Sequence, residues 1–297
     1  MTQIKKSILN SKKLKQYIEK INFNDIDDSQ SKLELVNQWV KLTNSASFYQ
    51  SKETELQGKF LFDVFGKILG YSSKLENPDE WNLNQEQVTT IGGKFADGSL
   101  GFYNIQNKVI RVVIELKNPN TNLDERQHRY QDNRTPVQQA FDYQHSIGRD
   151  CKWVIVSNFN EIRLYHHSSS IEFELFYIKD LYDNEKLKYF FFLLGKDNLI
   201  SKDGNSAIDD LFISNEQEEQ EITKTFYAAF KRHRLNFFDQ LKKNNPTINE
   251  NILLEKTQKI LDRFIFICFA EDNRLLPELI FKNILKTAKS SFATDET

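Results

Sequence analysis

The chain of 297 residues is 39% hydrophobic, which provides enough apolar surface for a buried core and enough length for two ordinary domains. Its 40 basic and 42 acidic side chains give a formal net charge of −2, so the chain as a whole lacks the positive charge of a simple nucleic-acid-binding protein. A polyanion would have to be bound by a local basic patch. The two cysteines, Cys151 and Cys268, have no CxxC spacing, which excludes a disulfide scaffold and a cysteine-based zinc site.

The sequence shows no membrane or export segment. No apolar run approaches the roughly 18 residues that span a bilayer. The first residues lead into a polar helical pattern and not into the apolar core of a signal peptide. We therefore expect a soluble, cytoplasmic protein.

The first third of the chain is predicted to be helical. Polar helical patterns over residues 7–21 and 31–42 indicate a helical lead-in that occupies residues 1–44. A stronger helix is predicted over residues 52–69, where apolar side chains recur every four residues. Gly70 is a typical residue for ending it.

A strand hairpin follows. Residues 100–105 and 108–117 are rich in β-branched and aromatic side chains, and Gln106-Asn107 between them is typical of a hairpin turn. Side chains alternate between the two faces of a strand. One face of the second strand should therefore carry Ile110, Val112, Ile114 and Leu116, and the other Arg111, Val113, Glu115 and Lys117.

The middle of the chain combines a helix with further strands. Thr135-Pro136-Val137-Gln138 supplies an N-cap, a proline at the first helical position and a capping-box glutamine, and the helix should end near Gly148. Strands are predicted over 152–157 and 161–166, with a further possible strand over 173–177. This order predicts an α/β domain over residues 45–180, with a mixed sheet flanked by helices.

The strand signal disappears after about Leu181. A helix is predicted over 186–194, then mostly loop over 195–215, then long amphipathic helices over 216–243 and 253–274. We expect residues 181–297 to form an all-helical connector.

The hairpin brings charged residues together. A turn centred between Gln106 and Asn107 pairs residues whose numbers add up to about 213, which places Asp97 across from Leu116, between Glu115 and Lys117. Two carboxylates at a strand end suit a hard divalent cation such as Mg²⁺. The alternative is a solvated Glu-x-Lys ion pair, which is the commoner role of such a pair alone.

Gln139 and Tyr143 add an independent pattern. They are four residues apart, so they project from the same side of the predicted helix. Taken alone, they would equally fit a surface glutamine beside a half-buried tyrosine.

Together these motifs resemble the PD-(D/E)xK nuclease superfamily in its RecB-like variety, although Ala96 replaces the proline of the name. The resemblance rests on Ala96-Asp97-Gly98, Val112-Val113-Ile114-Glu115-Leu116-Lys117 and Gln139-Ala140-Phe141-Asp142-Tyr143.

The resemblance implies a role for each matching residue. Asp97, Glu115 and the backbone carbonyl of Leu116 would bind Mg²⁺, for which Mn²⁺ is expected to substitute, and Lys117 would serve the attacking water. Gln139 and Tyr143 would help to position the site and the DNA. The family also has an acidic residue on the helix before the hairpin. Glu53 and Glu55 are both candidates, and Glu53 is the better placed on the core-facing stripe.

A more particular resemblance, over most of the chain, is to the N-terminal half of type IIG restriction-modification enzymes. It rests on the segments 60–71, 135–140, 153–159 and 264–277. It implies a nuclease domain and helical connector that precede an adenine-specific methyltransferase, which uses S-adenosylmethionine, and a target-recognition domain. The chain has no Asn-Pro-Pro-Tyr motif and no glycine-rich cofactor loop, so we expect those two parts outside it.

Contacts with double-stranded DNA must come from local basic residues, which bind phosphates without reading sequence. The candidates are Arg126, His128, Arg129 and Arg134 in the loop before the Gln-Tyr helix, and Lys224, Lys231, Arg232, His233 and Arg234 farther along. The sequence thus favours a Mg²⁺-dependent DNA endonuclease. A non-catalytic DNA- or partner-binding module and a RecB-like repair nuclease acting on DNA ends are the alternatives.

Overall fold

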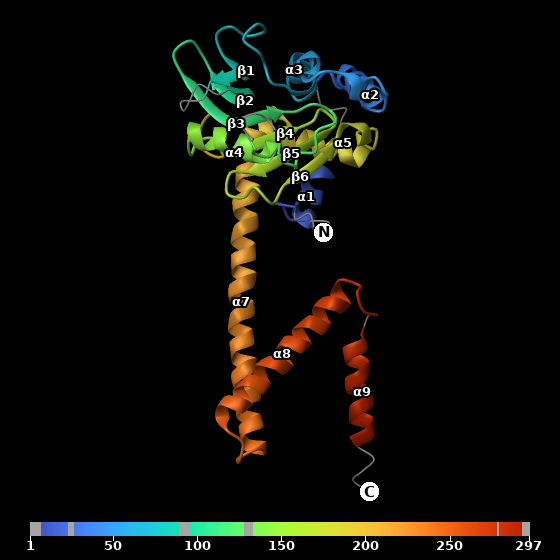
Figure 1. The fold of residues 1–297 in the computed structure, drawn as a ribbon, viewed down its shortest axis with the longest axis vertical. Helices are drawn as coiled ribbons and strands as arrows, with labels where there is room; N and C mark the ends of the chain where they lie inside the picture. Colours follow the sequence, from blue (N-terminus) through green and yellow to red (C-terminus); the bar gives the residue numbers. More distant parts are fainter. Residues whose placement is uncertain (1–6, 23–26, 89–94, 128–132, 278, 293–297) are drawn as a thin grey trace. The chain divides into compact units, whose positions relative to one another are not determined.

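A computed structural model describes residues 7–22, 27–88, 95–127, 133–277 and 279–292. The chain divides into two compact units, residues 1–216 and 217–297. The first unit contains the sheet and the helices on its two faces, and the second is helical (Figure 1). The predicted α/β domain followed by a helical region is therefore confirmed.

One mixed sheet organises the first unit, with its strands in the order β1-β2-β3-β4-β5-β6. All neighbouring strands are antiparallel except β3 and β4, which are parallel and are joined through helix α4. The strands are β1 (Trp81–Val88), β2 (Phe95–Tyr103), β3 (Lys108–Leu116), β4 (Trp153–Ser157), β5 (Glu161–His166) and β6 (Glu174–Tyr177), and α4 spans Pro136–Ile147.

Apolar side chains bury both faces of the sheet. On one face Val112, Ile114 and Leu116 of β3 belong to the main core, together with side chains from helices before and after the sheet. On the other face α4 packs Ala140 and Phe141 against β4 and β5. Burial on both faces explains why β4 is an almost uninterrupted apolar run.

The helices of the first unit come from both ends of its sequence. Those before the sheet are α1 (Ser11–Ile18), α2 (Ser29–Thr43), the short η2 (Phe48–Gln50), α3 (Glu53–Phe60) and η3 (Leu61–Ile68). Those after it are η4 (Ile178–Asp180), α5 (Asn184–Leu194), α6 (Lys196–Leu199) and the start of α7 (Ala207–Asn244). Because both sets pack into the main core, this compact unit extends beyond residue 180.

The predicted helix over 52–69 is present, but its second half, η3, is a π-helix. The backbone N–H of Leu69 donates to the carbonyl of Val64, five residues back, at 3.0 Å. Gly70 then takes a positive φ of 85°, a backbone conformation that suits glycine. The sequence indicated where this helix ends but not how its last turns are wound.

The predicted hairpin register was wrong by one residue near the site and by two near the turn. The turn spans Asn104–Asn107, where the Asn104 side chain accepts hydrogen bonds from the backbone of Gln106 and Asn107 at 2.9 and 2.6 Å. A bulge then adds one residue to β3, so that Leu100 pairs with Val112 while Gly101 pairs with Ile110.

The bulge also explains an error about Ile110. This side chain lies with Val113 on the α4 side of the sheet and not with Val112 and Ile114, as simple alternation predicted. Beyond the bulge the alternation holds toward the end of β3.

Two further elements were not predicted. No strand was predicted where β1 lies, because Asn, Gln and Glu dominate it, and it forms by pairing with β2. Residues 195–215 were expected to be mostly loop, but α7 begins at Ala207. Ser206 and Asp209 cap it reciprocally, each side chain accepting from the other's backbone N–H at 3.0 Å.

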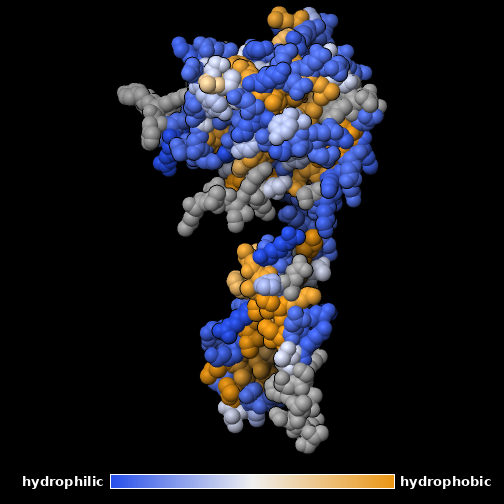
Figure 2. Space-filling view, turned by 90° about the vertical axis from the view of Figure 1, so that its right-hand side faces the viewer, coloured by the Kyte–Doolittle hydropathy of each residue, from blue (hydrophilic) through white to orange (hydrophobic). Residues whose placement is uncertain are grey.

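The second unit consists of the rest of α7, α8 (Glu250–Asp272) and α9 (Ile280–Phe292). Arg234 of α7 donates to Gln258 of α8 at 3.2 Å, and the rings of Phe264 and Phe281 join α8 to α9. Many apolar side chains of these helices are exposed, as Figure 2 shows. Among the described residues, none of the helices combines the length and apolar character needed to cross a membrane.

The bulge gives a test of the hairpin. A Cβ at Gly101 would lie 2.0 Å from the carbonyl oxygen of Val109. We expect Gly101→Ala to lower the free energy of unfolding by about 1–3 kcal/mol, because β3 would have to move. Urea denaturation monitored by circular dichroism measures this loss.

Gly58→Ala is the matched control, because nothing lies within 4 Å of a Cβ at that helical position. It should leave the stability unchanged or raise it by about 0.5–1 kcal/mol. Equal stability of the Gly101→Ala variant and the wild type would contradict the described register.

Candidate functional site

The ends of β2 and β3 bring together Asp97, Glu115 and Lys117. The backbone N–H of Leu116 donates to Asp97 Oδ2 at 2.7 Å, so Asp97 does lie beside the Glu-x-Lys segment despite the shifted register. The backbone N–H of Lys117 donates to the carbonyl of Ser157 at 2.8 Å, which extends the parallel pairing with β4. These backbone bonds position the three side chains.

Glu115 and Lys117 form a buried ion pair between Glu115 Oε1 and Lys117 Nζ. Only 1% of Glu115 and 2% of Lys117 is exposed. Glu115 follows Val113 by two residues, so it points to the face where Val113 packs with Tyr143 of α4. The pair is therefore not the solvated ion pair that was considered as an alternative.

The surroundings of Glu115 favour its neutral form. Burial raises the pKa of the Glu115 carboxyl to about 8, the Asp97 and Glu53 carboxylates add to this shift, and Lys117 opposes it. The second oxygen, Oε2, is buried and has no hydrogen-bond partner among the residues described by the structure. A buried carboxylate with an unsatisfied oxygen is typical of a functional site.

Helix α3 supplies the acidic residue that precedes the hairpin. Glu53 is half-buried, and its charge acts on Glu115. Glu55 is exposed and accepts from the backbone N–H of Lys52 at 3.0 Å, closing the first turn of the helix. The structure therefore brings Glu53, and not Glu55, toward the site.

The role of Gln57 was not predicted from the sequence. It lies one turn after Glu53 on α3, and its Nε2 is 3.4 Å from Asp97 Oδ1. The four-residue spacing from Glu53 was the available signal, because side chains at that spacing share one side of a helix.

Helix α4 turns Gln139 and Tyr143 toward each other. The Gln139 amide donates to the Tyr143 hydroxyl at 2.8 Å, and Gln127 donates to Gln139 at 3.2 Å. Burial, followed by the charge of Glu115, raises the pKa of Tyr143. Gln139 and Tyr143 therefore share one side of the helix, as their four-residue spacing predicted, and Tyr143 lies within electrostatic range of Glu115 and Asp97.

The predicted DNA-binding arginines differ in their surroundings. Arg126 is exposed, whereas Arg134 forms an ion pair with Asp142 of α4. Arg129 and His128 lie outside the described residues. In the second unit Lys224, Lys231, Arg232 and His233 are exposed, but Arg234 is held by Gln258.

The residues present fit a divalent cation that keeps several of its waters. Asp97 and Glu115 supply two carboxylates, and Glu115 Oε2 needs a partner. Within the described part of the chain, no three or more histidine, cysteine, aspartate and glutamate side chains are grouped so that they could hold a metal ion, so the protein would supply only the two carboxylates and backbone oxygen. The Leu116 carbonyl remains a predicted ligand.

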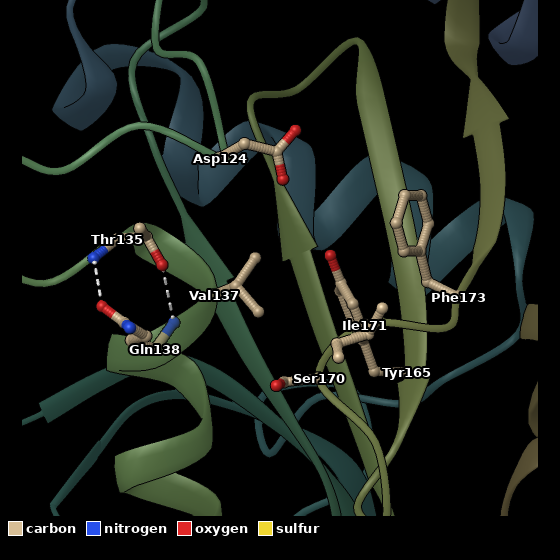
Figure 3. A pocket seen from close by; sticks show the side chains of 8 residues that line it. All are labelled: Asp124, Thr135, Val137, Gln138, Tyr165, Ser170, Ile171 and Phe173. Carbon is tan, nitrogen blue, oxygen red and sulfur yellow. Dashed lines mark hydrogen bonds between the residues drawn. The ribbon is translucent and has the colours of Figure 1, made fainter. Parts of the chain in front are cut away.

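A separate pocket of about 400 Å³ lies between the start of α4 and the β5 and β6 region (Figure 3). Three of its polar side chains are already engaged: Asp124 binds Arg163 at 2.7 and 2.9 Å, and the Gln138 and Thr135 side chains cap α4. Neither Asp97, Glu115 nor Lys117 lines it. The cluster of Asp97, Glu115 and Lys117 at the end of β3 is thus the stronger candidate site.

The family model described as "MmeI, N-terminal domain" matches residues 32–211, which is more than half of the chain and includes every residue of this site. Searches of curated proteins and of solved structures gave no match. The match confirms the resemblance to the N-terminal nuclease region of type IIG restriction enzymes. The chain therefore belongs to the MmeI N-terminal domain family.

Proposed function

We propose that the first unit is a Mg²⁺-dependent DNA endonuclease that hydrolyses phosphodiester bonds as the cleavage part of a type IIG restriction-modification enzyme. The observation that carries this proposal is the buried Glu115–Lys117 pair beside Asp97, with one oxygen of Glu115 unpaired. Family membership supports the same function.

Each side chain then has a chemical task. Asp97, Glu115 and the Leu116 carbonyl would hold the cation, which, when bound, acidifies a water and stabilises charge on the phosphate. Lys117, fixed by Glu115, would orient the attacking water or offset developing negative charge. Glu53 adds negative charge beside the pair, and Gln57 would hold the Asp97 carboxylate.

A purely DNA-binding module is the competing class. Such a module has no need for converging carboxylates, which repel phosphate, and burying them has a substantial desolvation cost. A repair nuclease acting on DNA ends would use the same chemistry but would require a free end, so a closed circular substrate separates it from an endonuclease.

The proposed partner is double-stranded DNA, contacted through Arg126, Arg129 and Arg134. Base recognition and adenine methylation would belong to target-recognition and methyltransferase parts, and S-adenosylmethionine would bind only in the latter. The protein would act in the cytoplasm, where its DNA substrate lies.

A plasmid-nicking assay tests the site. With protein in excess and Mg²⁺ or Mn²⁺ present, we expect Asp97→Ala and Lys117→Ala each to lower the cleavage rate by about 10²-fold or more, because each removes a group that stabilises the transition state. Chelation of the metal should stop cleavage in the wild type.

Asp79→Ala and Lys41→Ala are suitable controls, because these substitutions remove the same charges from exposed side chains. They should cut like the wild type. Unchanged cleavage by the Asp97 and Lys117 variants, or a wild type that is inactive with either metal, would count against the proposal.

The Glu115 pKa predicts how cation binding depends on pH. Because Glu115 must lose a proton to bind a cation, the affinity for Mn²⁺ should rise about tenfold per pH unit up to about pH 8 and then level off. Isothermal titration calorimetry measures this slope, and Glu115→Gln should abolish it. A wild-type affinity independent of pH would disprove the assignment.

The same shift affects folding of the metal-free protein. A carboxyl whose folded pKa is raised from 4.5 to about 8 binds more protons in the folded state, so it lowers stability progressively as pH rises through that interval. We expect Glu115→Gln to remove this part of the pH dependence, which urea denaturation at several pH values would detect. An identical pH profile for the variant would contradict it.

A further inference from the structure

Gln127, in the segment between β3 and α4, is hydrogen-bonded to Gln139, the partner of Tyr143 on α4. Its side-chain Nε2 donates to Gln139 Oε1 at 3.2 Å, and its backbone N–H donates to the carbonyl of Arg134 at 3.0 Å. Neither the sequence motifs nor the family match assigns a role to this residue.

The hydrogen bonds run in a fixed direction along three side chains. A glutamine amide has one acceptor end and one donor end. Because Gln127 donates to the oxygen of Gln139, the nitrogen of Gln139 faces Tyr143 and donates to its hydroxyl at 2.8 Å. The Tyr143 oxygen is then an acceptor, which leaves its own proton available to a different acceptor.

Two observations link these hydrogen bonds to the site. Burial, together with the Glu115 and Asp97 charges, raises the pKa of Tyr143, so this phenol lies within reach of the site carboxylates and keeps a proton that it can donate. In addition, Gln127 Oε1 is buried and finds no hydrogen-bond partner among the residues that the structure describes. An unsatisfied buried oxygen is costly and is typically kept where it serves a site.

We propose that Gln127 is a positioning residue: it holds the Gln139 amide in the orientation that makes Tyr143 donate its hydroxyl proton to a phosphate oxygen of bound DNA. This inference rests on the proposed nuclease function. Gln127 itself does not contact the reacting atoms.

Gln127→Glu tests the direction of the hydrogen bonds. At mildly alkaline pH the glutamate can only accept, so the Gln139 amide must turn to donate to it. Gln139 Oε1 would then accept the hydrogen bond of the Tyr143 hydroxyl, which could no longer donate to the phosphate. We expect single-turnover plasmid cleavage to fall by roughly 10²-fold, as in Tyr143→Phe, with little change in DNA affinity.

Gln138→Glu is the matched control. It adds the same charge to the residue next to Gln139. A glutamate at this position can still accept from the backbone N–H of Thr135, as Gln138 does at 3.0 Å. It should cut like the wild type. The Gln127→Glu,Tyr143→Phe double variant should be no slower than either single variant, because both remove the same donor.

A second measurement does not depend on cleavage. With tyrosine labelled by ¹³C at Cζ and the signal assigned through Tyr143→Phe, the Tyr143 pKa should rise more in Gln127→Glu than in Gln138→Glu, because the phenol changes from acceptor to donor. Gln127→Met, similar in size, removes the amide without adding charge. In this variant the Tyr143 pKa should rise less than in Gln127→Glu.

The outcomes separate the two proposals. Wild-type rates in Gln127→Glu, or equal Tyr143 pKa shifts in both glutamate variants, would overturn the role of Gln127. An inactive wild type, or a Lys117→Ala variant that cuts normally, would instead overturn the nuclease function. In that case the labelled-tyrosine titration would still decide whether Gln127 orients the Gln139–Tyr143 hydrogen bond.

Discussion

Burial of the Glu115–Lys117 ion pair is the constraint around which the first unit is built. Removing both charges from water costs several kcal/mol per ion before their attraction is counted, so the pair needs fixed geometry and further polar partners. β3 provides the geometry because it is paired on both sides, with β2 and β4. Asp97 contacts the Leu116 backbone beside the pair, and the carboxylates of Asp97 and Glu53 act on Glu115. Lys117 alone does not balance the negative charge of several carboxylates, which agrees with the divalent cation proposed for this site.

The two helices around the site contribute in different ways. α3 brings an acid and an amide, Glu53 and Gln57, to the Asp97 side of the hairpin. α4 brings a hydrogen-bonded pair whose phenol remains protonated. Under the proposed function, the acidic side of the site would hold the cation, and the neutral phenol on the other side would donate a hydrogen bond to the phosphate. The net charge of −2 is compatible with this chemistry, because the proposed catalysis depends on a few local carboxylates, Asp97, Glu115 and Glu53, and not on a general basic surface.

Sequence periodicity was sufficient to predict the helices and strands whose buried side chains recur at regular spacing. The helix before the hairpin, β3, α4 and β4 were predicted because their apolar spacing and caps are strong local signals. β1 was missed because its polar residues form a strand only through pairing with β2. Asp97 was placed beside Leu116, yet its register was wrong, since the Asn104 turn and the β3 bulge depend on hydrogen bonds that spacing does not reveal. Gln57 and Gln127 were missed for a similar reason: both are polar residues whose importance comes from partners distant in the sequence.

The bulge opposite Gly101 divides the hairpin into two parts that should tolerate insertions and deletions differently. At the turn, Asn104–Asn107 lies beyond the bulge, so a change of loop length there leaves the pairing of Gly98 with Ile114 intact. Between the bulge and the end of β3, removal of one residue would exchange the two faces of the strand and turn Glu115 and Lys117 toward the apolar core. In related chains, length variation of this hairpin should therefore be confined to its tip, and the segment from the bulge to Lys117 should keep a constant length.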